Sequence, residues 1–351
     1  MATLTQLPLP PHYVEGDSRQ QDYYVADVNG LLHKAVEWRG QHGIQPVGSD
    51  RKRIHALLID AQYDFSSPQG SLYVGGQSGN GAMDDAARMA EWVYRNLGVI
   101  SEITMTLDSH LLYQIFVPSA HLLSDGSHPA PFTVITEDDY RSGKYEPNPA
   151  MAKQLNVDAT WLRRQFVHYC HELKAGGRYD LSLWPYHCLI GSHGHKLSGV
   201  VDAARQFHAF VRGAKNDPEV KGGNPLTENY SIFGPEVTTL HSGGAIPGAQ
   251  KNTRLIEALL RADYVVIAGQ AASHCVAWTI KDLLRHILAN DPSLAKKVYI
   301  MHNCTSSVVI PGLVDYTPQT EAAFAEFQNA GMHLVNSTDP IESWPGIELV
   351  A

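Results

Sequence analysis

The chain of 351 residues has few cysteines, and the four it has form none of the usual pairs. Cys170, Cys188, Cys275 and Cys304 are widely spaced, and none lies in a CxxC pattern. Disulfide-stabilised small domains and thiolate zinc sites both depend on recurring, mostly close cysteine spacings. The sequence therefore argues against a disulfide framework and a zinc-finger-like site, and each thiol remains free for another role.

Basic runs and long apolar runs are also missing. The formal net charge is −9 at pH 7, and no Lys/Arg run offsets it, which argues against a nucleic-acid or acidic-membrane surface. No stretch approaches the 18 or so apolar residues of a membrane span, and the N-terminus lacks the basic start and apolar core of a signal peptide. We therefore expect a cytoplasmic protein that binds neither nucleic acid nor membrane.

What the sequence does contain is an alternation of apolar strands and amphipathic helices. We predict six strands, at residues 54–59, 103–107, 237–240, 264–268, 298–301 and 333–335. We predict helices at residues 81–97, 159–174, 200–213, 252–261 and 318–330, and a further one directly after Cys275. Strands and helices that alternate at this spacing form βαβ units, so the expected fold class is α/β with a parallel sheet.

The periodic part of the chain, residues 51–336, is expected to form one main domain. Residues 1–50 are polar, rich in Pro, Gly and Tyr, and without sustained periodicity, and we interpret them as an arm over the domain or over a partner subunit. Residues 111–183 look irregular, which is typical of a lid, a binding loop or an oligomer contact. The tail at 337–351, with Trp344, could strap an interface, and we expect a homo-oligomer, either a dimer or a tetramer.

Residues 264–284 hold the most informative pattern. A continuous apolar run is followed by a small-residue turn and an amphipathic helix, with Cys275 at the junction. Backbone N–H groups at a helix start favour a thiolate, but by only about 0.3–1 kcal/mol, or less than one unit of a cysteine pKa near about 8.5. A reactive Cys275 therefore needs a base or a cation nearby; otherwise it is a small apolar residue that fills the joint.

Polar groups that could supply this chemistry lie at the ends of other strands. Asp60 and Asp108 each end a predicted strand, and His110 is two residues beyond Asp108, so this pair could hold one ion. His187, in WPYHC, could be a third ligand, and Lys221, in a turn-rich segment, could place an ammonium over the strand ends. The structural alternatives are loop-capping aspartates, a surface or core histidine, and a surface lysine.

Other reactive side chains carry weaker signals. His121, Cys188, His274 and Cys304 are secondary candidates. The stretch SHGHK, residues 192–196, resembles a metal-binding tract, but no third ligand follows at a finger-like spacing, and we interpret it as an ordinary loop.

Five motifs together resemble a known family. DAQYDF (60–65), LDSH (107–110), WPYHC (184–188), KGGNPLTENYSIF (221–233) and AGQAASHCV (268–276) are similar, in content and order, to the nicotinamidase branch of the isochorismatase-like cysteine hydrolases. The resemblance covers about residues 60–310. It implies a three-layer αβα fold around a six-stranded parallel sheet, in agreement with the strand count.

The resemblance also implies catalytic roles. Cys275 corresponds to the nucleophile, Asp60 to the general base and then acid, and Lys221 to an ammonium that holds Asp60 and lowers the pKa of the thiol. The peptide bond between Gln270 and Ala271 corresponds to a cis bond in the family. That bond would turn the Ala271 N–H toward the Cys275 N–H to form an oxyanion hole.

Metal and substrate residues follow from the same comparison. Asp108, His110 and His187 match the ligands of one divalent ion, with waters completing the coordination of Zn²⁺, the favoured ion, or of Mn²⁺ or Fe²⁺. An aromatic set is expected to line the substrate site around a flat heteroaromatic amide: Phe65, Trp184 and Tyr230.

The implied function is a metal-assisted cysteine amidohydrolase. It would convert a small amide such as nicotinamide to the acid and ammonia through a thioester. Two differences leave the substrate open: Tyr63 stands where the family often has Asn, and His121 does not align with a further ligand or second-shell group that many members have. The alternatives are a related hydrolase acting on a carbamoyl, ureido or other small amide, and a catalytically silent scaffold.

Overall fold

The centre of the computed structural model, which describes residues 6–14 and 27–349, is a six-stranded sheet. Its strand order is β12-β9-β8-β1-β2-β7, and each neighbouring pair is parallel. The strands are β1 (Ile54–Ile59), β2 (Ile100–Asp108), β7 (Glu219–Lys221), β8 (Tyr264–Gly269), β9 (Val298–Met301) and β12 (His333–Val335). The predicted α/β fold class is confirmed.

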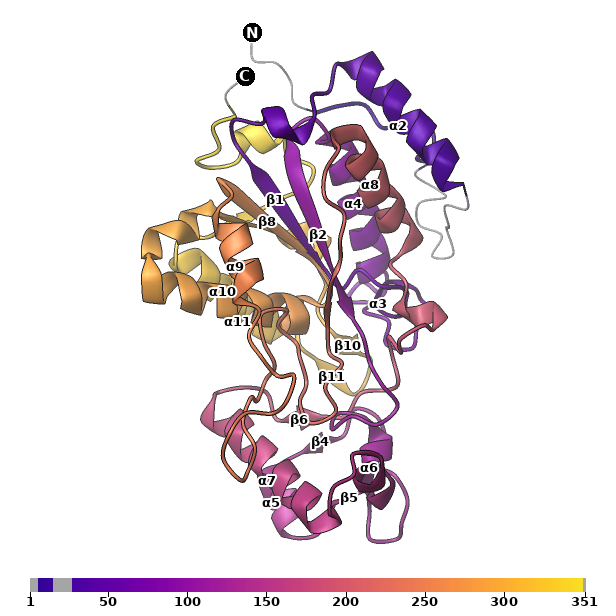
Figure 1. Cartoon of the computed structure of the whole chain (residues 1–351), viewed down its shortest axis with the longest axis vertical. Coiled ribbons are helices and arrows are strands. Elements are labelled where there is room, and N and C mark those ends of the chain that lie inside the picture. The colour runs from indigo at the N-terminus through magenta and orange to yellow at the C-terminus, as the bar shows by residue number, and fades with distance from the viewer. Residues whose placement is uncertain (1–5, 15–26, 350–351) are drawn as a thin grey trace.

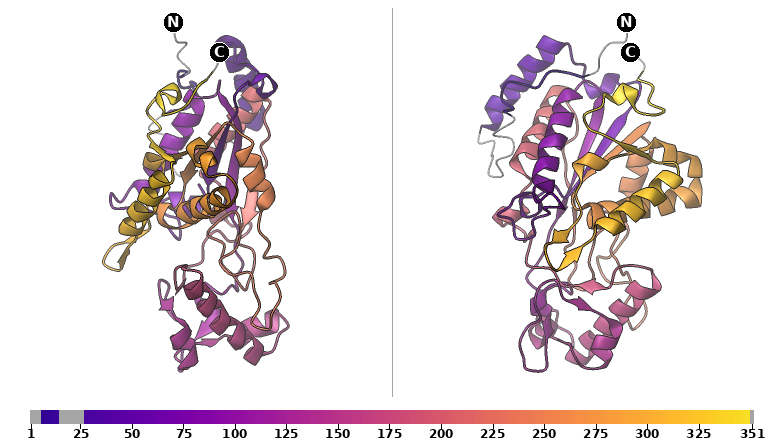
Figure 2. Two further views of the ribbon diagram at one scale, coloured as in Figure 1. Left: turned by 90° about the vertical axis from the view of Figure 1, so that its left-hand side faces the viewer. Right: turned by 180° about the vertical axis from the view of Figure 1, so that it is seen from behind.

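Helices cover both faces of this sheet, which makes three layers (Figures 1 and 2). One face carries α2 (Val28–His42), α4 (Gly81–Arg95) and α8 (Gly199–Arg212). The other carries α9 (Thr253–Leu260), α10 (Ala277–Asn290) and α11 (Thr317–Asn329). Every residue of the central strands β1 and β8 is buried, as expected where helices cover a parallel sheet on both sides. Each fully buried branched side chain there stabilises the fold by about 1.5–3 kcal/mol.

Residues 111–183 form most of a separate small lobe beneath the carboxyl ends of the strands (Figure 1). Its helices are α5 (Glu137–Arg141), α6 (Pro149–Gln154) and α7 (Ala159–Ala175). Strand β3 (His121–Leu122) pairs with β5 (Glu146–Pro147), and β4 (Val134–Ile135) pairs with β6 (Leu181–Ser182). The lobe is thus more regular than its sequence suggested, and it shares an apolar core with Phe65 and Trp184.

Short elements complete the rim of the sheet. Helix α3 (Tyr63–Ser66) follows β1, and a hairpin of β10 (Val309–Ile310) and β11 (Val314–Asp315) follows β9. Within the described ranges, none of the helices has the length and apolar character needed to span a membrane.

One predicted strand is wrong. Residues 237–240 form no strand and contribute only an isolated bridge between Thr239 and Ala245. The sixth strand is instead β7, which pairs with the edge of β2. Its sequence, Glu-Val-Lys, has no apolar run, and the side chain of Val220 is exposed. The hydrophobic pattern therefore gave no indication of it.

The N-terminal segment contains a helix that the sequence did not reveal. In α2, Leu31, Ala35 and Trp38 are buried at steps of four and three residues, and the helix packs on α8. The buried stripe is narrow, and other apolar side chains of the helix, Val28 and Val36, are exposed, so the sequence shows no clear amphipathic pattern. Residues 1–5 and 15–26, which belong to the predicted arm, lie outside the described residues.

The C-terminal tail packs on the chain's own core. Trp344 is buried, and its ring stacks on Tyr299 with centroids 5.7 Å apart. The Tyr299 hydroxyl donates a hydrogen bond to the Pro345 carbonyl oxygen at 2.7 Å. The tail therefore closes the β9–β12 side of its own domain, and the predicted homo-oligomer gains no support from it.

Candidate active site

Four strand ends bring the predicted reactive groups together at the carboxyl edge of the sheet. Asp60 follows β1, Asp108 ends β2, Lys221 ends β7, and Cys275 follows β8. The register of β2 and β7 places Asp108 opposite Lys221. Because β8, β1, β2 and β7 are consecutive in the sheet, residues 48 to 215 positions apart in the chain converge on one buried cluster.

The Lys221 ammonium is at the centre of this cluster. Its Nζ lies 2.9 Å from Asp60 Oδ2 and 2.9 Å from Asp108 Oδ1. It also donates a hydrogen bond to the Asn229 carbonyl oxygen at 2.9 Å and lies 3.6 Å from Cys275 Sγ. A lysine whose side chain is only 2% exposed thus bridges two carboxylates and faces the thiol.

The pKa values of Lys221 and Asp60 are both raised, but for different reasons. Burial alone would lower the pKa of Lys221, but the carboxylates of Asp108 and Asp60 outweigh it and raise that pKa well above its usual value. Burial raises the pKa of Asp60, and Lys221 only partly opposes this. Lys221 therefore stays charged, while Asp60 is a stronger base than an exposed aspartate.

Thr106 fixes the orientation of Asp60. The Asp60 N–H donates to Thr106 Oγ1 at 2.9 Å, and the Thr106 hydroxyl donates back to Asp60 Oδ1. Asp60 itself adopts a φ of 44°, in the left-handed region that few residues other than glycine occupy. Thr106 carries no motif signal in the sequence, although its position two residues before Asp108 on a strand puts it on the same face.

Cys275 lies in a π-helical turn, Ala272–Val276, that leads into α10. Its Sγ and the carboxylate oxygens of Asp60 and Asp108 lie within 4.8 Å of one another. Burial raises the pKa of the thiol well above its usual value, and Lys221 opposes this without reversing it. Lys221 thus acts on the thiol pKa in the expected direction, but burial at the helix start outweighs it and the net shift is upward.

The turn before Cys275 has the predicted backbone form. The bond between Gln270 and Ala271 is cis, and the Ala271 N–H donates to no acceptor among the described residues. The Gln270 side chain donates to Asp85 Oδ2 at 2.9 Å, and Asp85 also accepts a hydrogen bond from the Ser306 hydroxyl at 2.6 Å. Asp85, a buried residue of α4 that the sequence analysis did not single out, thus ties this turn to the loop after β9.

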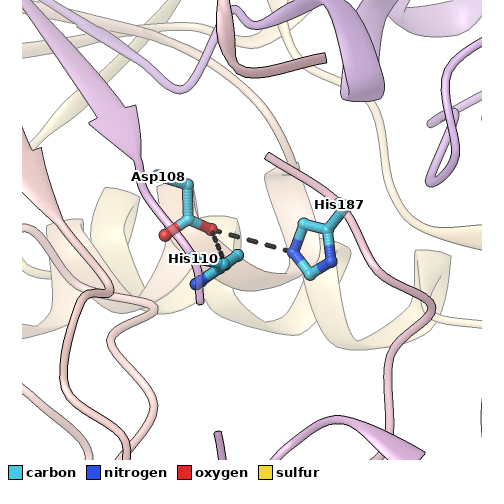
Figure 3. Close-up of side chains that lie close together, drawn as sticks. All are labelled: Asp108, His110 and His187. Carbon is cyan, nitrogen blue, oxygen red and sulfur yellow. Dashed lines mark ion pairs between the residues drawn. The ribbon is translucent and has the colours of Figure 1, made fainter. Parts of the chain in front are cut away.

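Asp108, His110 and His187 converge as predicted (Figure 3). Asp108 Oδ2 lies 3.0 Å from His110 Nε2 and 4.0 Å from His187 Nε2. All three side chains are buried. The carboxylate points between the two imidazole rings in Figure 3, so the three groups surround a common point.

The hydrogen bonds of the two histidines fit a metal ion at that point. His110 Nδ1 lies 3.1 Å from the Gly222 carbonyl oxygen, and His187 Nδ1 lies 2.8 Å from that of Pro185. A carbonyl can only accept, so each Nδ1 carries the proton and each Nε2 offers a lone pair toward Asp108. Burial alone would lower the pKa of His110, but Asp108 outweighs it and raises that pKa. The position thus favours a positive charge, either a proton or a metal ion.

Gly222 makes room for this group. It has a φ of 84°, and a Cβ at this position would lie 2.4 Å from Asp108 Oδ1 and 2.8 Å from His110 Cε1. The glycine that follows Lys221 is therefore required both by its backbone conformation and by the ligands packed against it.

A small cavity opens beside the thiol. Its volume is about 30 Å³, enough for little more than a water molecule. Its lining combines apolar walls with polar groups: Phe65, Leu72, Val74, Asp108, Trp184, His187, Glu228, Tyr230, Ala271, His274, Cys275 and Val308. All three predicted substrate-site aromatics line this cavity, and the Trp184 indole N–H donates to the Tyr230 hydroxyl at 3.0 Å.

Two polar residues of this cavity were not expected there: Glu228 was not a candidate from the sequence, and His274 was only a secondary one. Glu228 is buried, accepts a hydrogen bond from the Asn229 N–H at 2.7 Å, and has its pKa raised to about 7 by burial. His274, only a secondary candidate from sequence, also lines the cavity. Both lie inside the motifs at 221–233 and 268–276, but no spacing pattern gave either of them a role.

Other candidates lie outside the site. His121 is buried in the lobe, where its ring nitrogens lie 2.6 Å from the Tyr140 hydroxyl and 2.6 Å from the Ile115 carbonyl oxygen. The SHGHK stretch contains a short turn in which His195 Nε2 lies 2.7 Å from the Ser109 hydroxyl. Both histidines therefore have structural partners; for His195 this agrees with the interpretation of SHGHK as an ordinary loop.

The chain is structurally similar, over about four fifths of its length, to solved nicotinamidases and pyrazinamidases. A nicotinamidase/pyrazinamidase of Acinetobacter baumanii matches at 18% identity, covering 83% of this chain and 99% of its own, with a TM-score of 0.47. The yeast nicotinamidase bound to nicotinaldehyde matches at 17%, covering 81% and 99%, with a TM-score of 0.49. The pyrazinamidase of Pyrococcus horikoshii in complex with zinc matches at 17%, covering 81% and 98%, with a TM-score of 0.40.

No protein-family model and no curated protein matches the sequence. At such low identities and TM-scores, the chemistry of the site has to be argued from the distances, burial and charges within this chain.

Proposed function

We propose that the protein is a metal-assisted cysteine amidohydrolase that converts a small, flat heteroaromatic amide such as nicotinamide to its acid and ammonia. The observation that carries this proposal is the position of Lys221 Nζ, 2.9 Å from Asp60 Oδ2 and 3.6 Å from Cys275 Sγ. A buried base, a fixed ammonium and a thiol at one strand edge are the groups that nucleophilic amide cleavage requires.

The raised pKa values of Asp60 and Cys275 suit a proton transfer between them. In the first stage Asp60 takes the thiol proton, and Cys275 Sγ bonds to the amide carbonyl carbon. Asp60 then returns the proton to the amide nitrogen as the carbon–nitrogen bond breaks, which releases ammonia and leaves a thioester. In the second stage Asp60 takes a proton from water, which attacks the thioester carbonyl, and the acid leaves as the proton returns to sulfur.

The remaining groups have supporting roles in this proposal. The N–H groups of Ala271 and Cys275 would donate to the oxyanion that forms at the carbonyl oxygen. Lys221 would hold Asp60 in place and favour negative charge on sulfur. Phe65 and Trp184 would enclose the substrate ring.

Asp108, His110 and His187 would hold one divalent ion. Their oxygen and two nitrogen donors suit Zn²⁺ best, with Mn²⁺ or Fe²⁺ as alternatives. When bound, the ion would supply Lewis-acid chemistry, either by holding a ring nitrogen or by lowering the pKa of a bound water.

An ammonia-release assay tests the proposal. The purified protein is offered nicotinamide, pyrazinamide and a ureido compound, with and without added Zn²⁺, Mn²⁺ or Fe²⁺, and the bound metal is measured by elemental analysis. We expect release from the two heteroaromatic amides. Release from the ureido compound alone would favour the alternative cysteine hydrolase, and release from none would favour a silent scaffold.

A homo-oligomer remains a separate proposal. Exposed apolar side chains, Leu111, Leu112 and Ile190, lie on the loops beside the candidate metal ligands. Light scattering coupled to size exclusion gives the mass in solution, and the mass of a single chain of 38.6 kDa would contradict this expectation.

A further inference from the structure

Asp85, on α4, is a buried carboxylate outside the lining of the cavity beside Cys275. It is 1% exposed, and its two oxygens accept hydrogen bonds from three side chains. Oδ1 accepts from the Arg88 guanidinium at 2.7 Å. Oδ2 accepts from the Gln270 amide at 2.9 Å and from the Ser306 hydroxyl at 2.6 Å. A buried carboxylate costs free energy, so this one calls for an explanation.

The Gln270 side chain is held at both ends of its amide. Its Nε2 donates to Asp85, and its Oε1 accepts from the Ser306 N–H at 3.4 Å. The backbone N–H of Gln270 donates to the Ile59 carbonyl oxygen of β1 at 2.8 Å. Because Gln270 is 0% exposed, its amide has no solvent to bond to, and the Asp85 carboxylate fixes the direction in which it points.

Ser306, in the loop after β9, holds the other side of the same turn. Its hydroxyl donates to Asp85, and its carbonyl oxygen accepts from the Ala272 N–H at 2.8 Å. Ala271 lies between Gln270 and Ala272. The residues on both sides of Ala271 are therefore held by groups that meet at one carboxylate.

Ala271 is the residue whose position this arrangement fixes. It lines the cavity beside Cys275, and in the proposed function its N–H is one of the two donors to the oxyanion. Such a donor is effective only when it already points at the place where the negative charge develops. Neither Asp85 nor Gln270 lines the cavity, so neither would contact a substrate there.

We propose that Asp85 is a positioning residue for the oxyanion hole, which holds Gln270 and Ser306 so that the Ala271 N–H points at the oxyanion. The inference rests on the proposed amidase function and deepens it. The oxyanion forms only as the carbonyl is attacked. The loss of Asp85 should therefore slow the chemical step and leave binding of the intact amide nearly unchanged.

Steady-state kinetics on nicotinamide test this inference. In Asp85→Ala we expect kcat to fall about 10–100-fold, as for slightly displaced reacting groups, while KM stays within about threefold of the wild type. Asp85→Asn should recover part of kcat, because its side-chain oxygen can still accept from Gln270 and Ser306. A loss of kcat/KM that lies in KM alone would overturn the inference.

A double-mutant cycle tests whether Asp85 acts through Gln270. Gln270→Met keeps the length of the side chain and removes its donor, and it should also lower kcat. When Asp85→Ala is added to Gln270→Met, the combined loss should be smaller than the product of the two single losses, because the changes share one interaction. Losses that multiply in full would show that the two residues act independently and would contradict the inference.

Asp50→Ala is a matched control for a merely structural effect. Asp50 also accepts hydrogen bonds from an arginine and a serine, Arg212 and Ser101, but it precedes β1 and lies at the amino end of the sheet. This variant should melt at a lower temperature than the wild type and keep its kcat. If it loses as much kcat as Asp85→Ala, the effect of Asp85 is one of stability and the inference is wrong.

An aldehyde gives a readout that does not require turnover. When pyridine-3-carboxaldehyde binds, Cys275 Sγ bonds to the carbonyl carbon, Asp60 takes the thiol proton, and the electron pair of the carbonyl bond moves to oxygen as an oxyanion. Asp85→Ala should weaken this adduct by about the factor lost in kcat. It should leave unchanged both the affinity for nicotinate and the rate at which iodoacetamide, which forms no oxyanion, alkylates Cys275.

Equal weakening of the aldehyde adduct and of nicotinate binding, or an unchanged aldehyde affinity, would overturn the inference. If the wild type hydrolyses none of the amides, the proposed function fails. The ratio of aldehyde to nicotinate affinity in the wild type and in Asp85→Ala would still decide the role of Asp85.

Discussion

The two ends of the central sheet differ in the size of their cavities, and the reactive groups lie beside the smaller cavity. At the amino end, a hollow of about 600 Å³ is lined largely by charged side chains, among them Arg53, Glu102, Lys215, Glu219 and Arg254. At the carboxyl end, the cavity beside Cys275 measures about 30 Å³. The larger hollow therefore marks a solvated surface, whereas the reactive groups gather where water is excluded.

Ion pairs show the same difference. Arg254 pairs with Glu219 at the amino end, with the Arg254 side chain 65% exposed. Such exposed pairs contribute about 0–1 kcal/mol. At the carboxyl end, Lys221 and Asp60 are 2% and 0% exposed. Burial raises the pKa of Asp60, the two carboxylates raise that of Lys221, and each partner is indispensable to the other.

The largest expected effect is on catalysis. Replacement of Cys275 by Ala should lower ammonia release on the order of 10⁴-fold, because no thioester can form. The substitution removes one sulfur atom from a buried position, so circular dichroism should remain that of the wild type. Arg254→Ala, at the amino end, is the control and should keep full turnover. Unchanged turnover in Cys275→Ala would contradict the mechanism.

The next effect is on stability. Lys221→Ala leaves two buried carboxylates without a counter-charge, and we expect the free energy of unfolding to fall by about 3–5 kcal/mol. Arg254→Ala breaks an exposed pair and should cost less than about 1 kcal/mol. Urea titration measures both variants. Equal losses of unfolding free energy in the two variants would contradict the difference between the buried and the exposed ion pair.

Metal affinity should respond to a single methyl group. A Cβ at Gly222 would lie 2.4 Å from Asp108 Oδ1, whereas one at Gly223 would have only an ordinary contact, at 3.8 Å. We expect Gly222→Ala to weaken Zn²⁺ binding by about 10–100-fold, the range found when groups that orient metal ligands are disturbed. Gly223→Ala is the matched control in a calorimetric titration. Equal affinity in the two variants would place the ion elsewhere.

The smallest effect concerns pH. Burial raises the pKa of Glu236 from an ordinary 4.5 to about 8, against the opposing effect of Arg178. Between these values the folded state holds a proton that the unfolded state releases, so stability falls as the pH rises from about 5 to 8.

In Glu236→Gln, the fall in melting temperature between about pH 5 and pH 8 should be smaller than in the wild type, by on the order of a few degrees. Glu257→Gln, on the exposed side of α9, should leave the slope as in the wild type. An unchanged slope in Glu236→Gln would show that the folded state binds no extra proton at this position.

Much of the site followed from the sequence because its residues terminate apolar strands. Asp60 and Asp108 could be placed at one edge of the sheet from the hydrophobic runs before them, and the strands at 54–59, 298–301 and 333–335 were predicted with the bounds they have in the structure. Parallel strands leave no choice about which edge their carboxyl ends share.

The remainder depended on contacts between distant segments. Lys221 was expected on a turn, because β7 is a three-residue edge strand that acquires its conformation only by pairing with β2. Asp85 meets Gln270 across 185 positions of sequence. The raised pKa of Cys275 results from burial. Because side chains from distant parts of the chain bury this thiol, no local sequence pattern could predict the shift.

The bridge made by Lys221 has a consequence for the sign of the electric field in the site. One ammonium between the carboxylates of Asp60 and Asp108 leaves this buried group with a net charge of −1, which repels a thiolate. A divalent ion held by Asp108, His110 and His187 would reverse the sign to +1. A thiolate at Cys275 would then be less strongly disfavoured by the charges around it.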